Sequence, residues 1–166
     1  MRAFVEWLSA TDVSQLIQNV LWIVPAVQCV HILAIAMVVS SVAMVDLRLL
    51  GWMGRGQSMT QTVQRFVPWI WWGLVVLAIT GLVLIVGEPG RELRNISFWL
   101  KMSMLAVAIV ITFLFQRTIR SNAASWDRPG SSTRTVATKV GAVMTLFLWF
   151  AIAVAGRWIA YIHIDE

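Results

Sequence analysis

Three ionisable side chains, His31, Lys101 and Arg157, fall within or at the edge of long apolar stretches of this sequence. An ionisable group is costly inside a bilayer, so each of these side chains requires a partner or a function. Histidine has the widest chemistry of the three, because a neutral imidazole nitrogen can bind a metal ion or a haem iron. His31 is therefore the first candidate for a ligating residue.

His31 is ten residues into the first apolar stretch, which places it ~15 Å along a helix and near the centre of a bilayer. Small side chains on the same helical face would let a flat ligand or another helix approach closely. Two interpretations are open: His31 ligates a metal or haem iron, or it forms a hydrogen bond to a neighbouring helix. The residues that share its face are Gln28, Ala34, Ile35, Val38 and Ser41.

Lys101 and Arg157 are expected at shallower depths, ~8 Å and ~6 Å from the membrane boundary by the same rise per residue. Each could simply extend its charged end into the interface. Together with His31, however, they would form a central imidazole with two cations on one side of it. This arrangement suits haem, whose propionates are anionic, although a quinone or a phospholipid headgroup could also use the two cations.

Met104 shares the helical face of Lys101 and is expected close to the depth of His31. It is a candidate second axial ligand, since Met/His ligation of haem iron occurs. The alternative is packing, because methionine fills irregular gaps. Eight methionines and His31 would also suit soft Cu(I), but Met37 and Met44 lie on a different face of the helix from His31.

The elements that must position these residues are membrane-spanning helices. Hydrophobic residues make up 59% of the 166 residues and charged residues only 13%, which a soluble fold of this size could not bury. A bilayer span requires about 20 helical residues, and the apolar stretches do not alternate with period two as barrel strands would. The sequence predicts an all-α integral membrane four-helix bundle, a single domain over 1–166 with spans at about 21–45, 66–86, 96–116 and 140–161.

Residues 3–18 mix apolar and polar side chains and predict a short amphipathic helix lying flat on the membrane surface. The distribution of basic residues predicts the orientation. Segments 46–65 and 117–139 hold three and five Lys or Arg, whereas the N-terminal segment and 87–95 hold one and two. The positive-inside rule then places both termini outside, in the periplasm if the protein lies in a bacterial inner membrane.

Other chemistry is disfavoured by the sequence. Cys29 is the only cysteine, so an internal disulfide and a thiolate metal cluster are excluded. The net charge of +5 comes from basic residues in loops, which indicates contact with lipid headgroups rather than nucleic acid. The chain contains no G-x-S-x-G, phosphate-binding glycine loop or H-E-x-x-H pattern.

Several segments together resemble an uncharacterised family of four-helix bacterial membrane proteins. They are His31, the segment Asp46-Leu47-Arg48-Leu49-Leu50-Gly51, the segment Phe98-Trp99-Leu100-Lys101-Met102 and the segment Gly156-Arg157-Trp158-Ile159-Ala160. More distantly, the chain is similar to the group of copper-resistance protein D and HemJ-type protoporphyrinogen oxidase. That resemblance implies that His31 is a haem ligand and Lys101 its partner cation.

The expected function is that of a small haem-binding redox protein that exchanges electrons with a periplasmic partner. The expected cofactor is haem b, with His31 on the iron and Lys101, Arg157 and Met104 around it. Two alternatives remain open: a non-catalytic accessory subunit in a larger membrane complex, and a copper-handling protein. A homo-oligomer is also compatible with the sequence.

Overall fold

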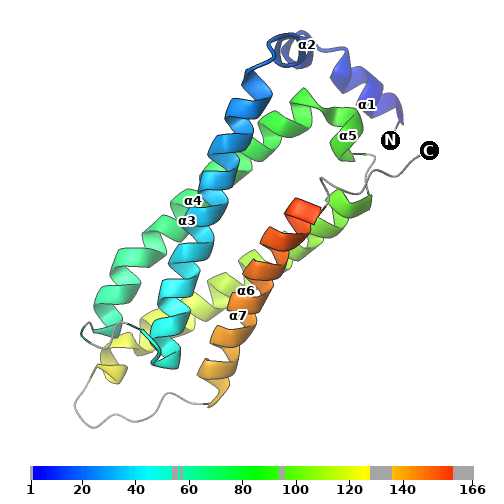
Figure 1. Cartoon of the computed structure of the whole chain (residues 1–166). Helices are drawn as coiled ribbons and strands as arrows, with labels where there is room; N and C mark the ends of the chain where they lie inside the picture. The colour runs from blue at the N-terminus through cyan, green and yellow to red at the C-terminus, as the bar shows by residue number, and fades with distance from the viewer. Residues whose placement is uncertain (1, 54–55, 57, 94–95, 128–135, 159–166) are drawn as a thin grey trace.

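The computed structural model describes residues 2–53, 56, 58–93, 96–127 and 136–158, and this part of the chain folds into helices joined by short turns (Figure 1). Four of the helices are long and apolar enough to cross a membrane. The predicted all-α architecture is therefore confirmed. The helices are α1 (Arg2–Ser9), α2 (Asp12–Asn19), α3 (Ile23–Leu50), α4 (Met59–Gly87), α5 (Pro89–Leu93), α6 (Ile96–Trp126) and α7 (Val136–Trp158).

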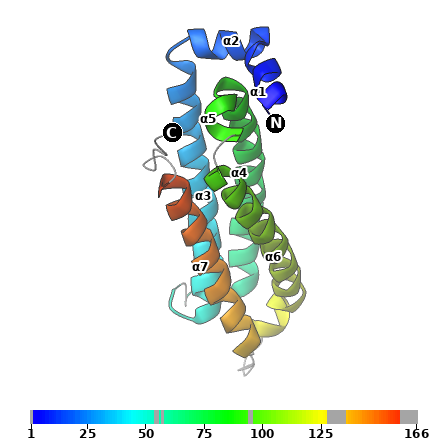
Figure 2. The same ribbon diagram turned by 90° about the vertical axis from the view of Figure 1, so that its right-hand side faces the viewer.

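The long helices form a bundle in which α3 packs against α4 and α7, and α6 packs against the same two helices. Helices α3 and α6 therefore occupy opposite corners of the bundle. Helices α1, α2 and α5 lie at one end, called here the α2 end, with α2 running across the bundle axis (Figure 2). The opposite end, called here the loop end, is where the chain passes from α3 to α4 and from α6 to α7.

The long helices continue beyond the apolar stretches that predict them. Helix α3 ends at Gly51, whose φ of 80° is left-handed and suits glycine. Helix α4 begins at Ser58, where Ser58 and Gln61 form a reciprocal capping box. Hydropathy marks the part of a helix that lipid surrounds, whereas these capping residues set where the helix itself ends.

The predicted N-terminal surface helix is divided into two, because Thr11 caps α2 by accepting a hydrogen bond from the Ser14 amide. Ser14 then attaches α2 to the bundle, since its hydroxyl donates to the Val86 carbonyl at 2.7 Å. Trp7 and Leu16 remain exposed on the side away from the bundle. This distribution is what a helix lying in a membrane interface requires, with apolar side chains available to lipid.

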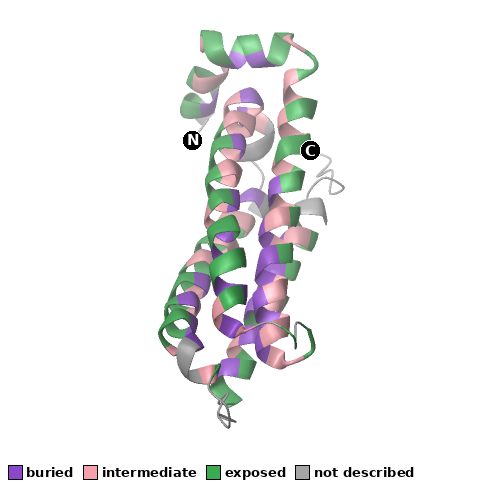
Figure 3. Ribbon diagram, turned by 90° about the vertical axis from the view of Figure 1, so that its left-hand side faces the viewer, coloured by how far each residue is buried: buried purple, intermediate pink, exposed green. Residues whose placement is uncertain are grey.

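Buried side chains concentrate toward the loop end and the middle of the bundle (Figure 3). Toward the α2 end, Ala34, Thr80 and Phe98 are buried as well. His31 and Lys101 are half-buried there. One cluster of buried apolar residues, the loop-end cluster, comprises Val45, Leu49, Met59, Val63, Val67, Ile119, Ala123 and Ala142. The other, the middle cluster, comprises Val38, Val42, Ile70, Ala108, Trp149 and Ile152.

Helices α3 and α4 pack closely because small residues recur every seven positions on α4. A Cβ on Gly73 would lie 2.5 Å from Val38 Cγ2, and one on Gly87 would lie 3.6 Å from Val24 Cγ2. Thr80 occupies the position halfway between the two glycines, and it meets His31. Spacings of seven on both helices are those of a continuous antiparallel contact. Small residues at such contacts let membrane helices approach each other closely.

We predict that Gly73→Ala destabilises the protein by about 1–3 kcal/mol, because the fully buried Val38 cannot move aside without strain. Gly81→Ala is the matched control, since its new Cβ would lie 3.7 Å from His31 Cε1, an ordinary contact distance. Thermal unfolding in detergent measures both. Equal melting temperatures for the two variants would contradict the packing described for Gly73.

Side-chain hydrogen bonds link all four neighbouring helix pairs. Thr145 donates to Asp46 across the α3–α7 contact at 2.6 Å. The Trp149 indole donates to Thr112 across the α6–α7 contact at 2.9 Å. The Trp71 indole donates to Gln116 across the α4–α6 contact at 3.1 Å. The fourth pair, α3 and α4, is linked through His31, as described below.

Asp127 joins the end of α6 to the start of α4. Its two carboxylate oxygens accept hydrogen bonds from the Met59 and Thr60 amides, at 2.6 and 2.9 Å. Desolvation acts to raise the pKa of Asp127, but these hydrogen bonds and the positive charge of Arg48 outweigh it, so the pKa is lowered. The carboxylate also lies at the positive end of the α4 dipole.

We predict that Asp127→Asn lowers stability by about 1 kcal/mol at neutral pH, as loss of a helix cap does. Because the folded-state pKa of Asp127 is below its ordinary value of 3.8, the stabilisation is present above that pH. It is lost as the pH falls through the folded-state pKa. Unfolding midpoints of the two proteins should therefore converge on acidification. A gap that is constant from neutral to acidic pH would contradict this role for the carboxylate.

Candidate functional site

His31 lies on the face of α3 that packs against α4, one heptad from Val24 and one from Val38. Its Nδ1 is 2.7 Å from the Thr80 hydroxyl oxygen, a short hydrogen bond between the two helices. His31 therefore satisfies one of the two sequence interpretations, the hydrogen bond to a neighbouring helix. That bond uses only one ring nitrogen, so it leaves the ligand interpretation open.

The hydroxyl of Thr80 determines which nitrogen of His31 carries the proton. Thr80 Oγ1 lies 2.7 Å from the Val76 carbonyl oxygen, which can only accept a hydrogen bond. The single hydroxyl hydrogen is therefore donated to Val76. Thr80 must then accept from His31, so Nδ1 carries the hydrogen. The neutral ring consequently has its lone pair on Nε2.

His31 Nε2 makes no hydrogen bond with any residue that the structure describes. His31 as a whole is half-buried. A metal-ligating histidine commonly donates its other ring N–H to a protein oxygen, which fixes the tautomer and the ring orientation. The contact with Thr80 orients the His31 ring in the same way. Nε2 is then the nitrogen whose lone pair could bind a metal.

Lys101 lies on α6, at the corner of the bundle opposite α3, and its positive charge acts on the His31 ring. The two residues predicted from the sequence as ligand and cation are therefore within electrostatic range across the bundle. Both are half-buried. An anionic group beside His31 would meet the Lys101 ammonium.

Met104 and Arg157 are placed differently from each other. Met104 packs against the middle cluster, so its described surroundings are those of a core side chain. No described contact brings it to His31. Arg157 belongs to the last turn of α7, and its side chain lies outside the described part of the chain. Among the four candidates, only His31 and Lys101 have a described interaction with each other, and it is electrostatic rather than a direct contact.

Asp46 is the buried polar group that the sequence-based interpretation did not foresee. It is 2% exposed and accepts a hydrogen bond from the Thr145 hydroxyl. A signal was available, because Asp46 continues the buried stripe of Val38, Val42 and Val45 at helical spacing. Its hydrogen bond with Thr145 links α3 to α7 at a point far from His31.

Metal sites built from several protein ligands are not found in the described residues, which contain no group of three or more His, Cys, Asp or Glu side chains. Cys29 is exposed and unpaired there. A site at His31 would therefore take one bond from the described side chains. This pattern suits a group such as haem, which brings four of its own nitrogen ligands to the metal.

Four apolar helices of this length define a multi-pass membrane protein in contact with lipid. The chain belongs to a family of unknown function, DUF6644, whose model matches residues 4–162. No curated protein and no solved structure matches the chain. The family match agrees with the resemblance to an uncharacterised membrane family and does not bear on the copper-resistance and HemJ-type group.

We predict that in Thr80→Val the neutral His31 ring can carry its hydrogen on either nitrogen, because the Nδ1–H then loses its acceptor. Thr80→Ser keeps a hydroxyl and should retain the wild-type tautomer. Nitrogen-15 NMR of histidine-labelled protein distinguishes the two forms, with the signal of His163 as an internal reference. Loss of the hydrogen bond should also cost about 0.6 kcal/mol of stability. A wild-type spectrum in Thr80→Val would contradict the assigned proton position.

Proposed function

We propose that this protein binds haem b through His31 Nε2 and takes part in electron transfer in a membrane. The observation that carries the proposal is the chain of two short contacts from His31 Nδ1 to the Thr80 hydroxyl and from that hydroxyl to the Val76 carbonyl. Thr80 accepts the Nδ1 hydrogen and passes its own to Val76, so that an unprotonated nitrogen is held in the apolar part of the bundle. A basic nitrogen with a supported ring is what an axial ligand requires.

The surroundings of His31 support an anionic, planar ligand. His31 and Lys101, which lie toward the α2 end, are both half-buried, so their side chains are not fully enclosed by the bundle. Gly81 adds no side chain beside the His31 ring. Lys101 offers a positive charge to a carboxylate such as a propionate. These features fit haem, which when bound would supply one-electron chemistry at its iron.

In this proposal each residue has its own role. His31 would hold the iron, Thr80 would orient the imidazole and Lys101 would bind a propionate. Arg157 is a second candidate cation from the sequence. The distant resemblance to HemJ-type proteins, carried by His31 and Lys101, supports the same assignment. A copper site is less well supported, because the described residues offer His31 no neighbouring His, Cys or acidic ligand set.

The orientation in a bacterial inner membrane is part of the same proposal. Basic residues are most frequent in 46–65 and 117–139, which belong to the loop end. The positive-inside rule then makes the loop end cytoplasmic and the α2 end periplasmic. His31 and Lys101 lie toward the α2 end, so an electron partner in the periplasm would be nearer to them than one in the cytoplasm.

We predict a Soret band and sharp bands after dithionite reduction in protein purified from cells with ample haem supply. His31→Ala should lower the haem content at least about tenfold, because the axial bond is lost. His163→Ala is the matched control, since it removes the other histidine of the chain. In His31→Gly, added imidazole should restore part of the absorbance by replacing the missing ring.

A colourless wild type would overturn the proposal, as would haem retained in His31→Ala. In either case an accessory subunit of a larger membrane complex becomes the leading function. Co-purification of a partner in constant ratio would then be the measurement to make. Copper without haem in a metal analysis would instead support copper handling.

A further inference from the structure

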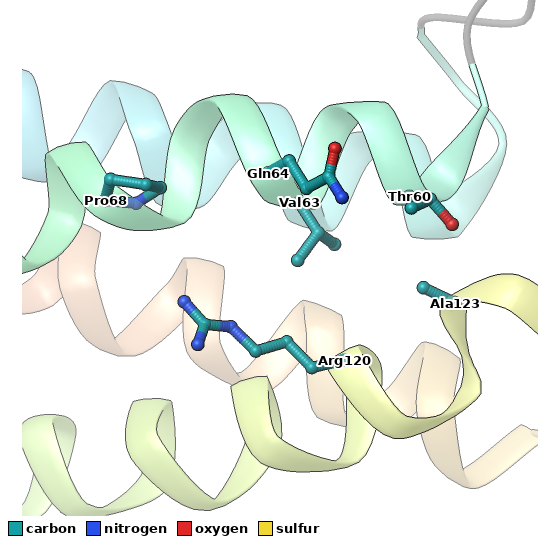
Figure 4. Close-up of a pocket in the computed structure, with 6 residues that line it drawn as sticks. All are labelled: Thr60, Val63, Gln64, Pro68, Arg120 and Ala123. Atoms are coloured by element: carbon teal, nitrogen blue, oxygen red, sulfur yellow. The ribbon is translucent and has the colours of Figure 1, made fainter.

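A cavity of about 400 Å³ opens between α4 and α6 near the loop end of the bundle. Figure 4 shows the Arg120 side chain extending from α6 into the space between the two helices, toward Pro68 of α4. The cavity is distant from His31, and neither the sequence motifs nor the haem proposal makes use of it. Its lining comprises Thr60, Val63, Gln64, Pro68, Arg120 and Ala123.

Arg120 is the charged group of this cavity, and it has no hydrogen bond or ion pair with any residue that the structure describes. A guanidinium is always charged and presents several N–H donors in a plane, a geometry that matches phosphate oxygens. Asp127 is the acidic group of the neighbouring turn, but its oxygens are already used by the amides at the start of α4. The charge of Arg120 is therefore available to an anion.

The polar groups on the α4 side of the cavity add capacity for hydrogen bonding. Thr60 and Gln64 offer a hydroxyl and an amide at one lining face. Pro68 has no N–H, so the Gln64 carbonyl lacks its usual donor four residues on. Val63 and Ala123 provide apolar walls. The site thus combines one cation, polar groups and apolar surface, as a headgroup at a membrane boundary requires.

Both helices carry exposed aromatic side chains beyond the cavity lining, Trp69 and Trp72 on α4 and Phe113 on α6. Tryptophan is enriched at the headgroup level of a bilayer, so these side chains place the cavity close to the lipid boundary. If a lipid phosphate binds at Arg120, the hydrocarbon chains of the same lipid could contact these exposed aromatic side chains.

We propose that this cavity binds the phosphate of an anionic phospholipid through Arg120. The walls belong to two membrane-spanning helices, so lipid is the anion carrier present at the highest local concentration. Basic pockets between membrane helices are known to favour anionic headgroups. The proposal is independent of haem binding at His31, because it uses other residues and another end of the bundle.

The test is native mass spectrometry of the delipidated full-length protein titrated with phosphatidylglycerol. Phosphatidylcholine is the zwitterionic comparison, since its phosphate is balanced by a quaternary ammonium and its net charge is zero. Arg120→Gln should weaken phosphatidylglycerol binding at least about fivefold, because the charge-assisted hydrogen bonds from the guanidinium to the phosphate are lost. Arg117→Gln is the matched control, since Arg117 is exposed on the same helix but does not line the cavity. It should change binding less than about twofold.

Equal losses in the two variants would overturn the proposal, because diffuse attraction to a basic end would then explain binding. Equal affinity for phosphatidylcholine in the wild type would overturn it as well. Inorganic phosphate provides a further arm: if millimolar phosphate displaces the lipid completely, the site is one for soluble anions. Retained binding in phosphate together with loss in Arg120→Gln supports the lipid site. Melting temperatures in detergent check that both variants are folded.

Discussion

Hydrogen bonds between helices are the interaction on which this bundle depends. Lipid solvates apolar side chains as well as another helix does, so burial of apolar surface contributes little to helix association in a membrane. Close packing and polar contacts must supply the specificity. Each neighbouring pair in the ring of α3, α4, α6 and α7 has one such contact: His31 with Thr80, Asp46 with Thr145, Thr112 with Trp149, and Trp71 with Gln116.

His31 differs from the other linking residues in having a second functional atom. Asp46 is almost fully enclosed, and its role is explained by the helix contact that it makes. His31 is half-buried and uses only Nδ1 in its contact with Thr80. The same hydrogen bond thus holds two helices together and leaves Nε2 unprotonated. A structural role and a ligand role are compatible at this residue, because each uses a different nitrogen.

Sequence reasoning predicts the four helices because each contains about 20 apolar residues, which lipid exposure requires. It also identifies His31, since an ionisable residue within such a stretch is rare. Thr80 could not be assigned as its partner, because hydropathy does not specify the relative positions of two antiparallel helices. The burial of Asp46 was not predicted, because the apolar stretch ends at about residue 45 whereas α3 continues to Leu50. The cavity at Arg120 depends on how α4 and α6 pack against each other, and this packing cannot be predicted from a single sequence.

The connection between α3 and α4 has a consequence for the order of assembly during synthesis. Gly51 ends one helix, Ser58 begins the next, and the glycine contacts of α4 all meet segments already made. The first helical hairpin can therefore complete its packing before the second leaves the ribosome, as local contacts generally form early. Asp127 follows 67 residues after Thr60 in the chain. Its hydrogen bonds to the start of α4 would then form late and join the α6–α7 hairpin to the α3–α4 hairpin.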